Sequence, residues 1–147
     1  MSTFLSLHYH LVFSTKCRAP LIRPSWIERL HEYMSGTVVG LKGVPQATGG
    51  VADHVHLLVG LKATHCLSDF VRELKKGASV WVHTQIGEPE FAWQEGYAAF
   101  TVSATARPAV KLYIANQAEH HRAKPFREEL AEMLRRAEIE FEERFLD

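Results

Sequence analysis

The sequence is poor in cysteine and has no long apolar run, and both scarcities narrow the classes of protein to consider. Its 147 residues include two cysteines, Cys17 and Cys66, which lie far apart and show no paired-ligand spacing. We therefore expect two free thiols in a reducing compartment, and neither a disulfide framework nor a zinc knuckle. No window approaches the roughly 18 uninterrupted apolar residues of a membrane span. The stretch MSTFLSLHYH lacks the basic region and apolar core of a secretion signal, so we expect none.

The formal net charge is zero, because 17 basic side chains balance 17 acidic ones. The distribution is uneven: residues 128–147 carry three basic and eight acidic side chains, which leaves the rest of the chain with an excess of five positive charges. A basic body with an acidic tail suits a nucleic-acid partner without identifying one, and the tail is equally compatible with a solvated helix face. Length and composition predict one globular domain over residues 1–147.

Hydrophobic periodicity and turn residues predict alternating strands and helices. Strands are expected over 4–14, 51–61 and 97–103, and GVPQATGG leads by a short turn into the second of these, which suggests a strand pair. Helices are expected over 24–40, over 68–81, from Pro108 to about His121, and from Phe126 onward. The order β-α-β-β-α-β is that of the ferredoxin-like, RRM-like plan, an α+β fold whose antiparallel sheet has helices on one face, here with additional C-terminal helices.

Two histidines, His54 and His56, lie two residues apart within the apolar run GGVADHVHLLVGL. Because side chains alternate across a strand, both imidazoles project from one face, while Val55 and its alternating apolar neighbours project from the other toward the core. Two such imidazoles can chelate a divalent ion, but two ligands are too few for a metal site. The same spacing occurs at His8 and His10. The spacing alone therefore also fits a half-buried strand with two tolerated histidines.

The third predicted helix supplies two more candidate site residues within LYIANQAEHH. Tyr113 and Gln117 are four residues apart, so they share one helical face with Cβ atoms about 6 Å apart. A phenol is a nucleophile, and an amide oxygen is a neutral ligand for a cation that already has two histidines. The alternative is a surface helix whose Tyr113 packs and whose Gln117 is solvated. Candidate phosphate contacts, which could equally be solvated side chains, are Arg72, Lys75 and Lys76 on one helix and His120, His121, Arg122 and Lys124 on the other.

Taken together, these segments resemble the single-tyrosine HUH transposases of the insertion-sequence-200/605 type. The resemblance rests on YHLVFSTKCRAPLI, GGVADHVHLLVGL, LSDFVRELKKGAS, FAWQEGYAAFTVS and YIANQAEHHRAKPFREEL, which occur in the family's order and span about residues 8–146. It implies that His54, His56 and Gln117 hold Mg²⁺ or Mn²⁺ and that Tyr113 is the catalytic nucleophile. His10 matches the family's first-strand YH pattern, for which we expect a structural or site-lining role.

The resemblance implies a DNA transposase that cleaves and rejoins single-stranded DNA at insertion-sequence ends through a 5′-phosphotyrosine. It also implies recognition of DNA hairpins and a homodimer, in the cytoplasm of a bacterium or an archaeon, whose tyrosine helix can act in trans through a hinge at 103–108. Three alternatives remain: a domesticated relative associated with repetitive extragenic palindromes, a non-catalytic single-strand or RNA-binding module of RRM-like fold, and a histidine-based metallohydrolase. The second has no need of Tyr113 and Gln117 in register with a histidine pair, and the third gives no reason for the tyrosine.

Overall fold

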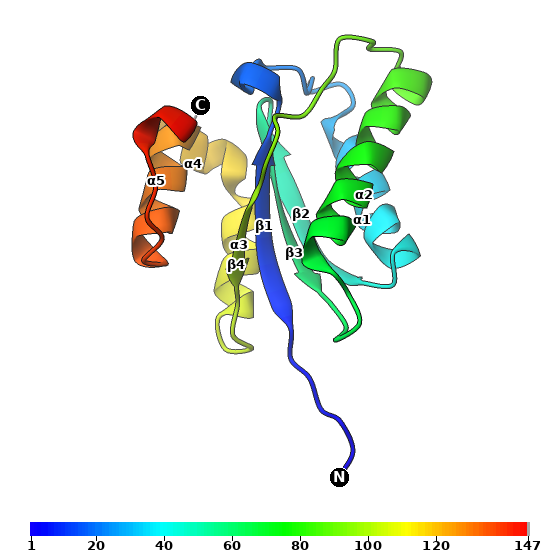
Figure 1. Cartoon of the computed structure of the whole chain (residues 1–147). Helices are drawn as coiled ribbons and strands as arrows, with labels where there is room; N and C mark the ends of the chain where they lie inside the picture. Colours follow the sequence, from blue (N-terminus) through cyan, green and yellow to red (C-terminus); the bar gives the residue numbers. More distant parts are fainter. Residues whose placement is uncertain (147) are drawn as a thin grey trace.

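A four-stranded antiparallel sheet, in the order β2-β3-β1-β4, lies between two layers of helices in the computed structural model, which describes residues 1–146 (Figure 1). The strands are β1 (His8–Ser14), β2 (Val44–Val51), β3 (His54–Gly60) and β4 (Ala98–Thr101). The helices are α1 (Ile27–Gly40), α2 (Leu67–Trp81), α3 (Arg107–Ala115), α4 (Gln117–Ala123) and α5 (Phe126–Arg136). Shorter helical turns span Lys16–Arg18, Val82–Ile86 and Glu143–Phe145. The predicted α+β plan is confirmed, with α1 and α2 on one face and the C-terminal helices on the other side.

The main core fills the space between the sheet and helices α1 and α2. On β3, Val55, Leu57 and Val59 all belong to it, as strand alternation predicts. Each such fully buried aliphatic side chain stabilises the fold by about 1.5–3 kcal/mol relative to exposure. The helix residues predicted to face inward are buried at Trp26, Leu30, Met34, Val38, Phe70, Val71, Leu74 and Ala78, and partly buried at Ile27 and Trp81. This layer therefore holds the sheet from one side and leaves the other face of β3 for the C-terminal helices.

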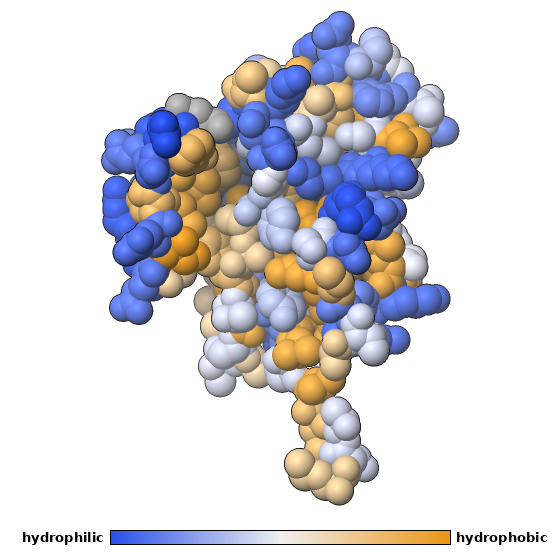
Figure 2. Space-filling model, viewed as in Figure 1, coloured by the Kyte–Doolittle hydropathy of each residue, from blue (hydrophilic) through white to orange (hydrophobic). Residues whose placement is uncertain are grey.

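The first strand is shorter than the sequence predicts, because it begins at His8 rather than at residue 4. Strand β1 pairs with β3 from His8 opposite Gly60, and β3 ends at that residue. The apolar residues before His8 consequently have no strand beside them, and they leave the body as an extended segment (Figures 1 and 2). Phe4 and Leu5 are exposed there. Pairing partners, not β propensity, determine where this strand starts.

The C-terminal layer lies close to the sheet because β2 has a glycine at the contact. Gly49 pairs with His56 of β3, so it lies beside that imidazole on the same face of the sheet. A Cβ atom on Gly49 would lie 2.4 Å from the backbone oxygen of Ile114 in α3 and 2.9 Å from its Cγ2 atom. The missing side chain thus lets α3 pack directly on the strand, next to the histidine pair.

Gly49→Ala is expected to lower the free energy of unfolding by about 1–3 kcal/mol, because the new methyl group meets helix backbone that cannot rotate away. Urea denaturation measures this change. The matched control is Gly36→Ala in α1, where an added Cβ meets nothing within 4 Å. That exposed helical position should gain about 0.5–1 kcal/mol from the higher helix propensity of alanine. Equal effects of the two substitutions would contradict the close contact between β2 and α3.

Candidate functional site

The two histidines of β3 lie on the face of the sheet that the C-terminal helices cover. Both side chains are fully buried, at 0% exposure. The sequence predicts their shared face correctly, but it gives no indication that this face is covered as well. The Nδ1–H of His54 donates to the carboxylate of Asp53 over 2.7 Å, and His56 Nδ1 lies 2.8 Å from His10 Nε2 in a second hydrogen bond. With both Nδ1 atoms engaged, the Nε2 atoms are directed into the space under the C-terminal helices.

His10 therefore lines the site, which agrees with the role expected for the first-strand histidine. Burial, and then the neighbouring His56, lower the pKa of His10 to about 3. The imidazole is consequently neutral near pH 7, when it can share one proton with His56 without adding a charge. Burial also lowers the pKa of His56. A neutral imidazole is the form that binds metal ions.

The predicted single helix from Pro108 to about His121 is wrong in one respect, because the chain leaves helical geometry at Asn116. There the backbone has φ −100° and ψ 21°, which ends α3 and starts α4. Asparagine is a poor residue for a helix interior, since its amide competes for backbone hydrogen bonds. The break separates α3 from α4, and Tyr113 near the end of α3 and Gln117 at the start of α4 both face the site.

Gln117 is the first residue of α4 and is buried, with 1% exposure. Its Oε1 atom lies 3.1 Å from His54 Nε2 and 3.0 Å from His121 Nε2. Tyr113 is partly buried, and its ring centroid is 5.6 Å from that of His56. The structure thus brings together Tyr113, Gln117 and the histidine pair, the set proposed from the sequence.

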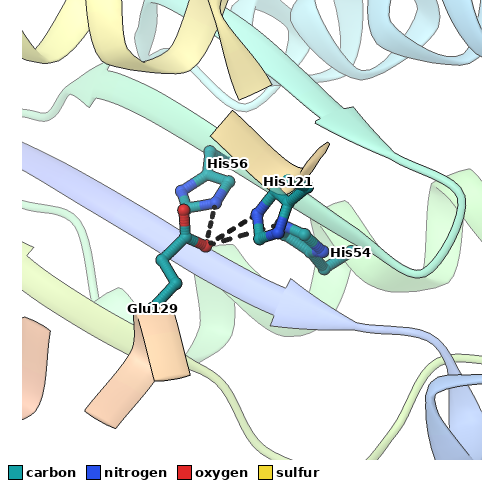
Figure 3. A group of neighbouring side chains, drawn as sticks. All are labelled: His54, His56, His121 and Glu129. Carbon is teal, nitrogen blue, oxygen red and sulfur yellow. Dashed lines mark hydrogen bonds and ion pairs between the residues drawn. The ribbon is translucent and has the colours of Figure 1, made fainter. Parts of the chain in front are cut away.

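Glu129 of α5 is a central member of the site that the sequence analysis missed. Its side chain is 2% exposed, and its Oε1 atom lies 3.1 Å from His56 Nε2, 3.5 Å from His54 Nε2 and 3.2 Å from His121 Nε2 (Figure 3). Although burial alone would raise the pKa of Glu129, hydrogen bonds from His121 and His56 hold it well below its usual range. One indication in the sequence was available, since Glu129 lies three residues after the buried Phe126 and thus on the apolar face of an otherwise charged helix.

Tyr113 donates its hydroxyl hydrogen to the second carboxylate oxygen of Glu129, Oε2. Gln117 Nε2 donates to the same oxygen over 3.2 Å. Burial and the bond to Glu129 raise the pKa of Tyr113 well above its usual value, because ionisation would place two negative charges side by side. In this arrangement the phenol is neutral and held, not activated.

His121, expected from the sequence to face a phosphate-rich partner, instead points into the site. Its Nδ1–H donates to the backbone oxygen of Lys124 over 2.7 Å, and its side chain is 10% exposed. Burial alone would lower the pKa of His121, but the bond to Glu129 raises it. Four potential ligand atoms, one each from His54, His56, His121 and Glu129, lie within 4.8 Å of one another. Imidazole nitrogens and a carboxylate oxygen are donors that divalent transition metals accept, so these residues fit a metal ion.

Comparison with known proteins identifies the family that this geometry belongs to. A family model described as "Transposase IS200 like" matches residues 3–117, which is most of the chain. The chain belongs to the IS200-like transposase family. Among curated proteins, none matches the transposase.

Two solved structures are similar to the transposase. A candidate transposase from Deinococcus radiodurans R1, determined by crystallography, is 25% identical with a TM-score of 0.63, covering 80% of this chain and 95% of that one. A REP-associated tyrosine transposase bound to a REP hairpin is 14% identical with a TM-score of 0.60, covering 82% of this chain and 74% of that one. The second likeness establishes a shared fold. Within residues 1–146, the transposase has no helix long and apolar enough to cross a membrane.

The other basic residues predicted to contact DNA fall into two separate places in the transposase. Arg72, Lys75 and Lys76 lie on α2, across the sheet from the histidines. Arg72 pairs with Asp69 at 2.9 Å, and Lys75 donates to the backbone oxygens of Gln94 and Gly96. On the site side, a pocket of about 430 Å³ opens beside Tyr113 and is also lined by His120, Lys124, Glu129 and Arg136. This pocket gives access to the tyrosine, and its lining carries both signs of charge, since Glu132 pairs with Lys124 over 2.7 Å.

Proposed function

We propose that this IS200-like transposase cleaves and rejoins single-stranded DNA at the ends of an insertion sequence, with Tyr113 as the nucleophile. The observation that carries the proposal is the convergence of the Tyr113 hydroxyl, the Gln117 amide and the imidazoles of His54 and His56 at one place. The imidazoles come from β3, which is distant in sequence from α3 and α4, the helices that carry Tyr113 and Gln117. A binding module that merely stacked bases would need exposed aromatic rings on the sheet, not a buried cluster of this chemistry.

In the proposed reaction, the oxygen of Tyr113 attacks the scissile phosphorus. A bond from that oxygen to phosphorus forms as the bond from phosphorus to the 3′-oxygen breaks, and the phenol proton ends on the released 3′-hydroxyl. The product is a 5′-phosphotyrosine with the phosphodiester energy conserved, so a second 3′-hydroxyl can reverse the step and join new ends. Because an unperturbed tyrosine is only about 0.1% ionised at neutral pH, the nucleophile needs help from its surroundings.

A divalent ion is the proposed source of that help, with Mg²⁺ or Mn²⁺ held by His54, His56 and Gln117. Such an ion would polarise the phosphate and neutralise the charge that develops during attack. The chain contributes imidazoles whose Nε2 atoms are directed into the site by Asp53 and His10. Imidazole suits manganese better than magnesium, so we expect tighter binding of Mn²⁺.

Hairpin DNA and a homodimer complete the proposal for a single-domain enzyme of the cytoplasm. A REP hairpin is bound by the REP-associated tyrosine transposase of similar fold, which favours hairpin DNA as the ligand. On the site side, His120, Arg122 and Lys124 are the proposed phosphate contacts, and Arg72, Lys75 and Lys76 are proposed as a second, remote set. The same structural likeness favours a domesticated, palindrome-associated role as the second candidate. Hairpins that immediately flank the gene would identify a mobile element, and palindromes dispersed through the genome would identify the domesticated role.

The deciding experiment is a search for the covalent intermediate. The wild-type protein is incubated with a 3′-labelled single strand that contains a hairpin from the DNA around its gene, with Mn²⁺ or Mg²⁺, and the products are run on a denaturing gel. We expect a labelled band at the combined mass of protein and DNA fragment, which EDTA abolishes. The matched control is the same strand annealed to its complement. Absence of the band with every divalent metal would refute the proposed chemistry.

A further inference from the structure

We propose that the C-terminal helices give this chain a second, closed metal site that takes Zn²⁺, built from His54, His56, His121 and Glu129. This set differs from the His54, His56 and Gln117 set of the proposed reaction, because His121 of α4 and Glu129 of α5 take the place of Gln117. The inference concerns binding by the chain itself, and only its consequence for activity rests on the proposed function.

The hydrogen bonds of His54 and His121 orient both imidazoles toward Glu129. The Nδ1 atoms of His54 and His121 must carry hydrogens, because they face a carboxylate and a backbone carbonyl. The Nε2 atoms of both imidazoles are thereby directed at an oxygen of Glu129. Outer hydrogen bonds of this kind fix the orientation of metal-binding histidines.

The separations between the candidate ligand atoms match those of a tetrahedral zinc site. In a tetrahedral zinc site with bonds of about 2.0–2.1 Å, neighbouring ligand atoms are about 3.3 Å apart. The three separations from Glu129 Oε1 to imidazole Nε2 atoms are 3.1, 3.2 and 3.5 Å. All four ligand atoms lie within 4.8 Å of one another, so small inward rotations of the imidazoles would complete the tetrahedron. Three imidazoles and one carboxylate form a complete four-ligand set, which suits zinc and leaves no position for a phosphate.

The carboxylate of Glu129 links this closed site to the nucleophile. Its Oε1 atom faces the histidines, while its Oε2 atom accepts the hydrogen of Tyr113. Closure therefore fills the place of the scissile phosphate and keeps the phenol neutral at the same time. Withdrawal of α5 would open the phosphate position and free the hydroxyl of Tyr113. Gln117 Oε1, which already lies 3.1 Å from His54 Nε2, would then replace the lost ligand. The acidic tail, whose final residue Asp147 lies outside the described residues, then serves as a removable cover.

Isothermal titration of the metal-free full-length protein tests the site directly. We expect one Zn²⁺ per chain, bound more tightly than Mn²⁺. Glu129→Gln should weaken Zn²⁺ binding at least tenfold and leave Mn²⁺ binding within about threefold of wild type, since loss of a metal ligand or its support costs roughly 10–100-fold in affinity. The matched control is Glu128→Gln, the exposed neighbour on the same helix, which should titrate like wild type. Equal Zn²⁺ affinities of the Glu129 and Glu128 variants would overturn the proposal.

His121→Asn provides an independent ligand variant, and circular dichroism confirms that each variant is folded. It should lose Zn²⁺ affinity as Glu129→Gln does, and an unchanged affinity would also overturn the proposal. Co²⁺ supplies a readout of geometry, because a four-coordinate site absorbs visible light far more strongly than a six-coordinate one. We expect strong absorption from wild type and weak absorption from both variants. Strong absorption from all three proteins would exclude Glu129 and His121 as ligands.

The covalent-adduct assay separates this inference from the proposed function. Glu129→Gln should form the adduct faster than wild type with Mn²⁺, and Zn²⁺ should inhibit wild type more than the variant. If no protein forms an adduct while the Zn²⁺ affinities differ as expected, the proposed reaction fails and the closed site stands. If adducts form but the affinities do not differ, the closed site fails and the proposed reaction stands.

Discussion

Tyr113→Phe is expected to reduce covalent adduct formation by roughly 10⁴-fold or more, since loss of a nucleophile removes the reacting atom itself. The substitution keeps the aromatic ring that packs against His56 and His10 and deletes only the hydroxyl oxygen. Glu129 Oε2, which loses one hydrogen-bond donor, retains Gln117 Nε2 at 3.2 Å. The fold should therefore survive, and the labelled band on a denaturing gel measures the loss.

Tyr97→Phe is the matched control for this prediction. Tyr97 is 41% exposed and lies just before β4, away from the histidines. Its substitution should leave adduct formation within about twofold of wild type, as expected for a surface position. An undiminished adduct from Tyr113→Phe, or an equal loss from both variants, would contradict the assignment of Tyr113 as the nucleophile.

The sequence predicts well those strands and helices in which the spacing of apolar residues matches the face that is buried. In β3, alternation alone separates Val55 and Leu57 from His54 and His56, and the structure places the two sets on opposite faces. The same logic gives the inner faces of α1 and α2. Local patterns of this kind depend on neighbours within a few residues, which the sequence contains in full.

The site is less completely predictable, because its last members depend on tertiary contacts. The pair Tyr113 and Gln117 is visible from helical spacing, although the chain breaks at Asn116 between them. Glu129 belongs to a segment whose charge pattern indicates a solvated helix, and only the packing of α5 against the sheet buries its carboxylate. A glutamate inside a charged helix is expected at the surface unless buried partners stabilise it, and those partners are histidines from distant segments.

The last prediction concerns which chain supplies the tyrosine. Within the single described chain, Tyr113 lies beside its own histidine pair, and the contact of Ile114 with Gly49 holds α3 on β2. The trans arrangement that the resemblance implies would require α3 to leave that contact and to expose the residues it buries. We therefore expect each active site to form within one chain, even in a homodimer.

Mixing Tyr113→Phe protein with His54→Ala protein tests this expectation, because each variant lacks one half of the site. Differently tagged variants are mixed, allowed to exchange subunits and purified through both tags, and the adduct assay is then run on the mixed dimers. A site built within one chain predicts no more adduct than the parent variants form separately. Exchange of the tyrosine helix would instead give every mixed dimer one complete site of two, or about half of the wild-type signal per dimer. Recovery to that level would show that α3 leaves its own sheet and carries Tyr113 to the histidine pair of the other subunit.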